Sequence, residues 1–123
     1  MTEPQPSFAR LPINPADGFP QAFRLTVADR TYRFQLYANV AEELLDTTAG
    51  PLDLPVPGAF LVLAVDREEP AGLATILRRK LVPEVVYHAA ELALTFPTML
   101  LDPRNLNGVG EFGSQVVGGV APR

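Results

Sequence analysis

The sequence contains no cysteine, and it has a single histidine, His88, and a single lysine, Lys80. Without cysteine the chain has no disulfide framework, no thiol nucleophile and no zinc–thiolate site. One histidine excludes a metal site built on several histidines. The two serines, Ser7 and Ser114, lie near the chain ends, where a nucleophile is poorly held for a serine–histidine–acid triad. We therefore expect no enzyme activity, no cofactor and no metal.

Charged residues are also few, at 20% of the chain, against 47% hydrophobic residues and a net charge of −4. This composition excludes a wholly disordered protein. The chain has no basic stripe, so nucleic acid is not expected as a main partner. The longest apolar run, Ala59–Val65, is far shorter than the roughly 18 residues of a membrane span. Membrane insertion is therefore not expected, and the polar start MTEPQPSFAR predicts no secretory signal.

Apolar and polar residues alternate over residues 23–37, FRLTVADRTYRFQLY. The alternation runs up to a polar turn at Ala28–Arg30 and resumes after it. Period-two alternation on both sides of a short turn predicts a β-hairpin with one buried face. The residues predicted to face the core are Phe23, Leu25, Val27, Tyr32, Phe34 and Leu36.

Two further strands are predicted after a proline-rich stretch. The apolar run Ala59–Val65 has the length and the flanking turn residues of a strand buried on both faces. Leu73–Val82 follows the turn EEPAG and is predicted as the next strand. Residues 84–96 fit either a helix or two short strands, and the β-rich surroundings favour two strands split near His88–Ala90.

A short helix is expected at Val40–Leu45, with Gly50 as its stop. Together these segments predict a mainly β protein. The expected fold is a small β-barrel or β-sandwich with extended N- and C-terminal arms and at most one or two short helices.

The two ends of the chain differ in composition from its middle. Five of the 13 prolines lie in residues 1–20, and proline removes a backbone donor and disfavours helix. Residues 106–123 are rich in glycine and nearly uncharged. We therefore expect a body of residues 21–105 with two arms that dock on neighbouring proteins. The predicted anchors in the arms are Phe8, Leu11, Ile13, Phe112, Val116, Val117 and Arg123.

The C-terminal segment also spells G-x-G-x-x-G at Gly108–Gly113, the letter pattern of a dinucleotide-binding turn. In that turn the glycines follow a buried strand and open a helix, and an acidic residue follows about 20 positions later. Here ten residues follow Gly113, and they include Gly118, Gly119 and Pro122. These residues leave no room for the helix and the acidic residue, so a dinucleotide-binding turn is not predicted. The glycines are instead predicted to be hinges that let the segment fit closely against another protein.

Charged side chains cluster at a few places. The carboxylates of Glu42–Glu43, Asp66 and Glu68–Glu69 lie in predicted polar turns, where solvated ions are expected, and a calcium site or hydrolytic pair is the alternative. Arg78–Lys80 is the only basic cluster. Side chains alternate along a strand, so these three bases cannot share one face. They are expected to form a solvated strand end, with a phosphate or partner contact as the alternative.

The hairpin segment FRLTVADRTYRFQLYANV, with Tyr32–Phe34 as an aromatic and basic second strand, resembles the start of small phage tail proteins. These form the baseplate-plug and hub-associated family of contractile-tailed phages. The resemblance covers some 18 of the 123 residues, and the final segment NLNGVGEFGSQVVGGVAPR has no counterpart in it. It implies a compact, non-enzymatic β-domain that packs around the tail axis between tube and hub proteins.

The sequence therefore predicts a structural subunit of a phage tail, baseplate or related contractile injection assembly. Its partners would be other structural proteins, in several copies, and its location the virion tail or the cytoplasm during assembly. A soluble β-barrel module that binds a small ligand or peptide is the first alternative. An enzyme that uses Asp66, Glu68, Glu69 or His88 is the second.

Overall fold

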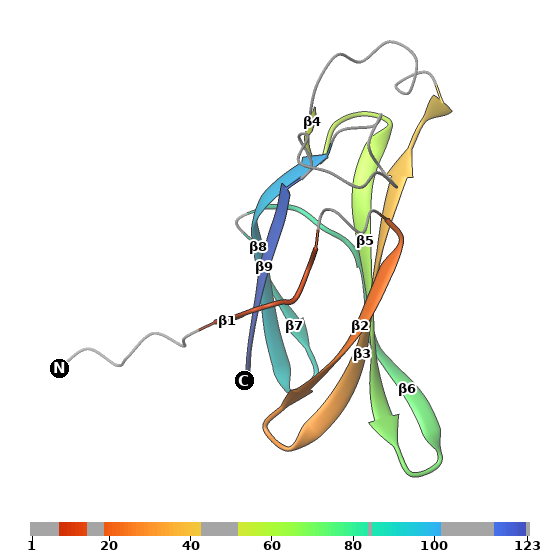
Figure 1. Cartoon of the computed structure of the whole chain (residues 1–123), viewed down its shortest axis with the longest axis vertical. Coiled ribbons are helices and arrows are strands. Elements are labelled where there is room, and N and C mark those ends of the chain that lie inside the picture. The colour runs from red at the N-terminus through yellow and green to blue at the C-terminus, as the bar shows by residue number, and fades with distance from the viewer. Residues whose placement is uncertain (1–7, 15–18, 43–51, 84, 102–114, 123) are drawn as a thin grey trace, which may run out of the picture.

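The computed structural model describes residues 8–14, 19–42, 52–83, 85–101 and 115–122. Each regular element in these ranges is a β-strand, so the expectation of a mainly β protein is confirmed (Figure 1). The strands are β1 (Ala9–Arg10), β2 (Gln21–Val27), β3 (Arg30–Val40), β4 (Leu52–Asp53), β5 (Ala59–Glu69), β6 (Gly72–Lys80), β7 (Val86–Ala89), β8 (Leu92–Leu101) and β9 (Gln115–Pro122).

The strands form two antiparallel sheets that face each other. One sheet has the order β2-β3-β5-β6, and the other has the order β1-β9-β8. On the far side of β8, β7 pairs with its first half and β4 with its last residues. The described strands make two open sheets rather than a closed barrel, so a β-sandwich is the correct alternative of the two expected.

The predicted hairpin is β2 and β3, joined by the two-residue turn Ala28–Asp29. Both turn residues have positive φ, 49° and 67°, which is the type I′ geometry that matches the twist of paired strands. The turn is thus one residue shorter than predicted, because Arg30 already pairs with Val27. Tyr32, Phe34 and Leu36 are fully buried, as the alternation predicts.

The other strand predictions hold with adjusted ends. The run that begins at Ala59 continues to Glu69, and its partner strand ends at Lys80, before Val82. Residues 84–96 contain two strands, β7 and the start of β8, with the turn at Ala90–Glu91. The predicted helix at Val40–Leu45 does not begin at Val40, because Val40 ends β3. Glu42 is helical, and residues 43–45 lie outside the described ranges, as does Gly50.

The expected arms are corrected where the structure describes them. Gln115–Pro122 forms β9, which lies between β1 and β8 and pairs with β8 from Leu92 to Leu100. Ala9–Arg10 pairs with β9 on its other side. A strand between two others is part of the body, so the division into a body of residues 21–105 and two arms fails for these segments.

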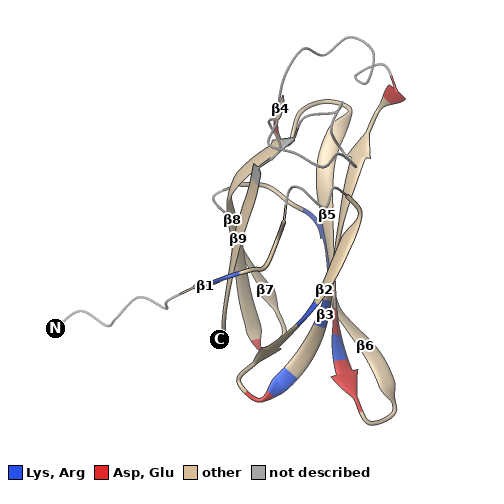
Figure 2. Ribbon diagram, viewed as in Figure 1, with Lys and Arg blue, Asp and Glu red and all other residues tan. Residues whose placement is uncertain are grey.

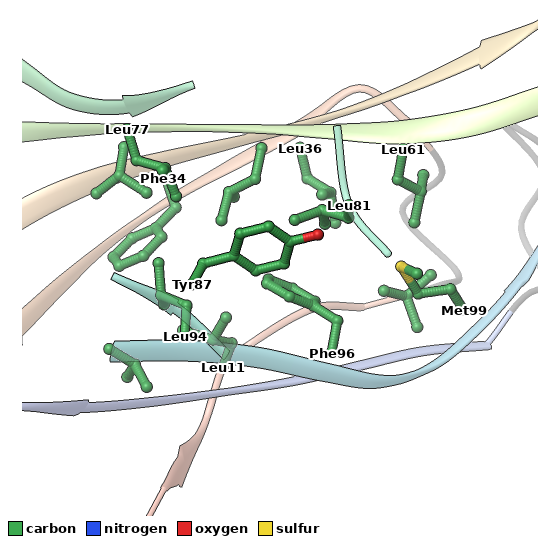
Figure 3. Packing of buried hydrophobic residues seen from close by; sticks show 14 of the residues in the cluster. Leu11, Phe34, Leu36, Leu61, Leu77, Leu81, Tyr87, Leu94, Phe96 and Met99 are labelled. Carbon is green, nitrogen blue, oxygen red and sulfur yellow. The ribbon is translucent and has the colours of Figure 1, made fainter. Parts of the chain in front are cut away.

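The core lies between the sheets and is filled by large side chains from both (Figure 3). Phe34, Leu36 and Leu61 come from one sheet, and Leu94 and Phe96 come from the other. Leu81, in the link from β6 to β7, is fully buried between them. Burial of each such side chain contributes about 1.5–3 kcal/mol.

Candidate docking surfaces

Charged residues of both signs gather at the hairpin end of the sandwich, defined as the end that carries the β2–β3, β5–β6 and β7–β8 turns (Figure 2). Arg67 on β5 holds the carboxylate of Glu91, in the β7–β8 turn, through Nε–Oε1 at 2.6 Å and Nη2–Oε2 at 2.5 Å. The hydroxyl of Tyr32 donates to Oε1 of Glu91 at 2.7 Å, and Arg30 lies 3.3 Å from the same oxygen. The cluster therefore joins the two sheets.

The electrostatics of this cluster make Glu91 a poor base. Hydrogen bonds from Arg67 and Tyr32 lower the pKa of Glu91 from 4.5 to about 2, against the opposing effect of burial. Burial, together with the hydrogen bond to Glu91, raises the pKa of Tyr32. A general base works best with a pKa near the operating pH, so this arrangement suits a structural link rather than proton transfer.

The four residues of the enzyme alternative do not converge. Asp66 accepts a hydrogen bond from Thr75 at 2.8 Å, and Glu69 accepts one from Arg67 at 2.8 Å. Glu68 binds arginines on the outer face of its sheet, and His88 is exposed on β7 of the other sheet. Within the described ranges no group of three His, Cys, Asp or Glu residues is placed to hold a metal ion.

The basic cluster on β6 divides between two sides of its strand, as alternation requires. Lys80 Nζ lies 4.7 Å from the centre of the Phe60 ring, and the Arg79 guanidinium lies 5.7 Å from that of Tyr87. Tyr87 in turn accepts a hydrogen bond from the backbone N–H of Val82 at 2.6 Å. The bases thus contact aromatic rings at exposed positions, where a cation–π contact is worth about 0.5–1 kcal/mol.

Three exposed valines lie in and just after the link from β6 to β7. Val82, Val85 and Val86 are 40%, 41% and 50% exposed, and we call them the valine surface. Sequence reasoning did not single out these valines, because Val82 was taken as the end of one strand and Val85 and Val86 as part of a segment of two strands or a helix. The available signal was Pro83, which ends a strand and leaves its apolar neighbours outside the ladder.

A second surface feature lies on the outer face of the β2–β3 hairpin. Two open hollows of about 420 and 240 Å³ adjoin there, because both are lined by Ala22 and Gln35. Arg24 and Arg33 line one end, and Tyr37 and Pro20 line the other. We call this continuous depression the β2 trough.

The arginines at the end of the β2 trough are directly opposite one another in the ladder. Arg24 binds Glu68 through Nε at 2.7 Å and Nη2 at 2.9 Å, and Arg33 approaches the same carboxylate at 3.5 Å. The hydrogen bond from Arg24 is the main reason that the pKa of Glu68 lies below its usual range. We call Arg24 and Arg33 the arginine pair.

The predicted arm anchors that the structure describes lie around β1 and β9. Leu11 and Val116 are each 2% exposed and point into this chain's own core, so they are not available to a neighbour. Ile13 is half-buried and packs against the same core. Phe8 and Val117 are half-buried and line a hollow of about 220 Å³ on that sheet. Phe112 and Arg123 lie outside the described ranges, as does Gly108–Gly113.

The last two glycines leave space for rings of the same chain. A Cβ on Gly118 would lie 2.5 Å from Cε1 of Phe96, and a Cβ on Gly119 would lie 2.8 Å from Cβ of Phe8. Both separations are below van der Waals contact. For these two glycines the predicted hinge role is wrong, because both lie in β9, where Gly118 permits close packing against Phe96 in the core and Gly119 permits close packing against Phe8 on the other face of the sheet.

Comparisons with family models, with curated proteins and with solved structures find no match to this chain. In the described part of the chain no helix is long and apolar enough to cross a membrane.

Proposed function

We propose that the protein is a non-enzymatic structural subunit of a phage tail, baseplate or related contractile injection assembly. The observation behind the proposal is the valine surface, in which three of the four large aliphatic side chains found exposed among the described residues fall within five positions of the chain. Exposed apolar side chains that gather in one region of a folded protein are typical of sites that bind another protein. The resemblance of the hairpin to phage tail proteins supplies the kind of assembly.

The surroundings of the valine surface fit a protein partner. The exposed Arg79, whose guanidinium lies 5.7 Å from the centre of the buried Tyr87 ring, lies beside it, and arginine is enriched at protein interfaces. The patch joins two edge strands, β6 and β7, which belong to different sheets. A neighbouring subunit that covers the valines can therefore also contact both sheets.

The valine surface takes the docking role that the sequence assigned to Leu11 and Val116. These two residues stabilise the sandwich itself, so they are not available to a neighbour. The body would then be rigid before assembly, and binding would cost little ordering of the backbone.

The experiment uses the tagged full chain in cells that produce the protein during particle assembly. Lysates are sedimented through a sucrose gradient, and tail particles are located by negative-stain electron microscopy. We expect the wild-type chain to sediment with the particles, and the Val82→Asp/Val86→Asp variant to stay at the top of the gradient. Both positions are exposed, so this variant should keep the thermal midpoint of the wild-type chain.

The matched control is Leu73→Asp, which changes another exposed aliphatic residue, at the opposite end of β6. This control should still enter the particles. A wild-type chain that remains at the top of the gradient while particles form would overturn the proposal. So would normal incorporation of the double valine variant.

A further inference from the structure

The basic cluster at the end of β6 carries positive charge that no carboxylate balances. Arg78, Arg79 and Lys80 are all exposed, and none of them forms an ion pair with a carboxylate of the described residues. Their partners in the ladder, residues 62–64 on β5, are apolar. Beyond those, residues 35–37 on β3 are also uncharged. The sheet therefore brings no acidic side chain into register with the cluster.

The surplus of positive charge is also present in the sequence around the cluster. Residues 78–88 contain three bases and a single acid, Glu84, which lies outside the described ranges. The whole chain, by contrast, has a net charge of −4. The end of β6 and the link that follows it thus form a basic region on an acidic protein.

Tyr87 fixes the basic cluster beside the valine surface. Its hydroxyl accepts a hydrogen bond from the backbone N–H of Val82 at 2.6 Å and donates one to the carbonyl oxygen of Lys80 at 3.3 Å. The Arg79 guanidinium lies 5.7 Å from the centre of its ring. Tyr87 is itself buried, whereas Val86, its neighbour on β7, is 50% exposed. Exposed bases and exposed valines are therefore held together where the chain crosses between the sheets.

The bases are spaced as an extended partner would need them. Arg78 and Lys80 lie on the outer face of β6, on either side of Arg79, which lies over Tyr87 of the other sheet. Residues two apart on one face of a strand are roughly 7 Å from each other. Acidic residues at alternate positions of an extended segment have the same spacing, so two of them can reach the two outer bases together.

We propose that the partner which covers the valine surface is a protein segment with an acidic stretch next to aliphatic residues. Its carboxylates pair with Arg78 and Lys80, and its aliphatic side chains cover Val82 and Val86. This inference deepens the proposed function and rests on it in taking the partner to be a protein.

Two other occupants fit this surface less well. Nucleic acid would bring phosphates to the bases, but its backbone has no aliphatic side chains to cover the valines. A second copy of this chain would have to use its own carboxylates, and those of Glu68, Glu69 and Glu91 are already paired with arginines of the same chain. An acidic and aliphatic segment satisfies both halves of the surface.

The test uses the purified full chain and fluorescently labelled peptides in which two leucines precede alternating glutamate and threonine. Matched peptides carry glutamine or lysine in place of glutamate, and a further one carries serine in place of leucine. Binding is followed by fluorescence anisotropy. We expect the glutamate peptide to bind about tenfold more tightly than the glutamine peptide, and the lysine peptide to bind most weakly. Salt should reduce these differences, because exposed charges are screened.

Two variants separate the charged and apolar contributions. Arg78→Glu should abolish the preference for glutamate over glutamine. Its matched control is Arg10→Glu, which changes the net charge equally at an exposed position of the other sheet and should keep the preference. Val82→Ser/Val86→Ser should weaken the leucine peptides but not the serine peptide, and it should also keep the preference for glutamate.

Equal affinity of the wild-type chain for the glutamate and glutamine peptides would overturn the proposal. So would tighter binding of a single-stranded DNA of the same charge, because the surface would then suit a nucleic acid. A dimer of the chain that Arg78→Glu dissociates would also overturn it, because the occupant would then be a second copy.

The peptide titration needs no particle, so its outcome is separate from that of the gradient experiment. If the glutamate preference is absent while Val82→Asp/Val86→Asp loses incorporation, the proposed function stands and the acidic partner is wrong. If that variant is incorporated normally while the wild-type chain prefers the glutamate peptide, the assembly role is wrong and the site for an acidic segment stands.

Discussion

Arg67 on β5 and Glu91 in the β7–β8 turn of the other sheet form a bidentate ion pair with separations of 2.6 and 2.5 Å. Tyr32 completes the contact by donating its hydroxyl to the same carboxylate. This carboxylate thus joins the β7–β8 turn to β3 and β5 across the hairpin end of the sandwich. Hydrogen bonds between an arginine and a carboxylate that form in such a bidentate pair are stronger than hydrogen bonds between neutral groups.

Glu91→Gln should make the protein less stable near neutral pH and less sensitive to acid. The folded-state pKa of Glu91 is about 2, below its ordinary 4.5, so its contribution to stability is present above about pH 4.5 and is lost as pH falls toward 2. We expect a loss of about 1–2 kcal/mol in the free energy of unfolding at pH 7. Urea unfolding between pH 2 and 7 measures both effects.

The control for that substitution is Glu69→Gln, which removes a single contact to the same arginine at an exposed site. It should change the free energy of unfolding by less than Glu91→Gln does. If Glu91→Gln retains the full acid dependence of the wild-type protein below pH 4.5, the ion pair is not the source of that dependence.

Gly118→Ala should destabilise the sandwich by about 1–3 kcal/mol, the usual range for an overpacked core. The added methyl group would lie 2.5 Å from a carbon of the buried Phe96 ring. Adding Phe96→Leu to Gly118→Ala should recover part of that loss, because it removes the clashing atoms. Thermal unfolding of both single variants and the double variant gives the coupling energy, and simple additivity would contradict the proposed clash.

Removal of residues 115–122 should unfold the protein rather than leave a folded body. This segment is β9, which pairs with β1 and β8 and buries Val116 and Val120. The truncated chain should lose its near-ultraviolet circular dichroism and its cooperative thermal transition. Addition of a peptide with the sequence of residues 115–122 should restore part of both. A cooperative transition in the truncated chain alone would show that the sandwich does not need β9.

Ala28→Asn should stabilise the β2–β3 hairpin slightly, and Ala28→Val should destabilise it. Ala28 has a φ of 49°, a left-handed conformation that asparagine adopts readily and β-branched residues avoid. We expect a gain of about 0.5 kcal/mol for asparagine and a loss of about 1–2 kcal/mol for valine. Chemical denaturation measures both, and an unchanged midpoint for the valine variant would argue against this turn geometry.

The strands that sequence analysis predicted correctly are those with a local signal. Phe34 and Leu36 occupy alternating positions on β3, and alternation places side chains on one face whatever the rest of the chain does. The division of residues 84–96 into β7 and the start of β8 was also predicted correctly, because the segments predicted on either side of them in the sequence favoured strands. The turn was predicted one residue too long, because the polar Arg30 was assigned to it although Arg30 pairs with Val27.

The candidate surfaces were harder to predict because they depend on contacts between distant segments. The valine surface exists because the chain crosses from β6 to β7, and so from one sheet to the other, at Val82–Val86. The arginine pair was within reach of sequence reasoning, since a two-residue turn sets Arg24 opposite Arg33. Their shared partner, Glu68, lies 44 residues from Arg24, and only folding brings it there.

The sequence by itself determined that this is a β protein with an amphipathic hairpin. It also determined that the chain has no cysteine and only one histidine from which to build a site. Only the tertiary structure decided that Gln115–Pro122, the described part of the glycine-rich end, is an inner strand rather than an arm. Composition indicates how a segment would behave in isolation. Gly118 and Val116 are buried because β9 pairs with β1 and β8, and those contacts are between segments far apart in the sequence.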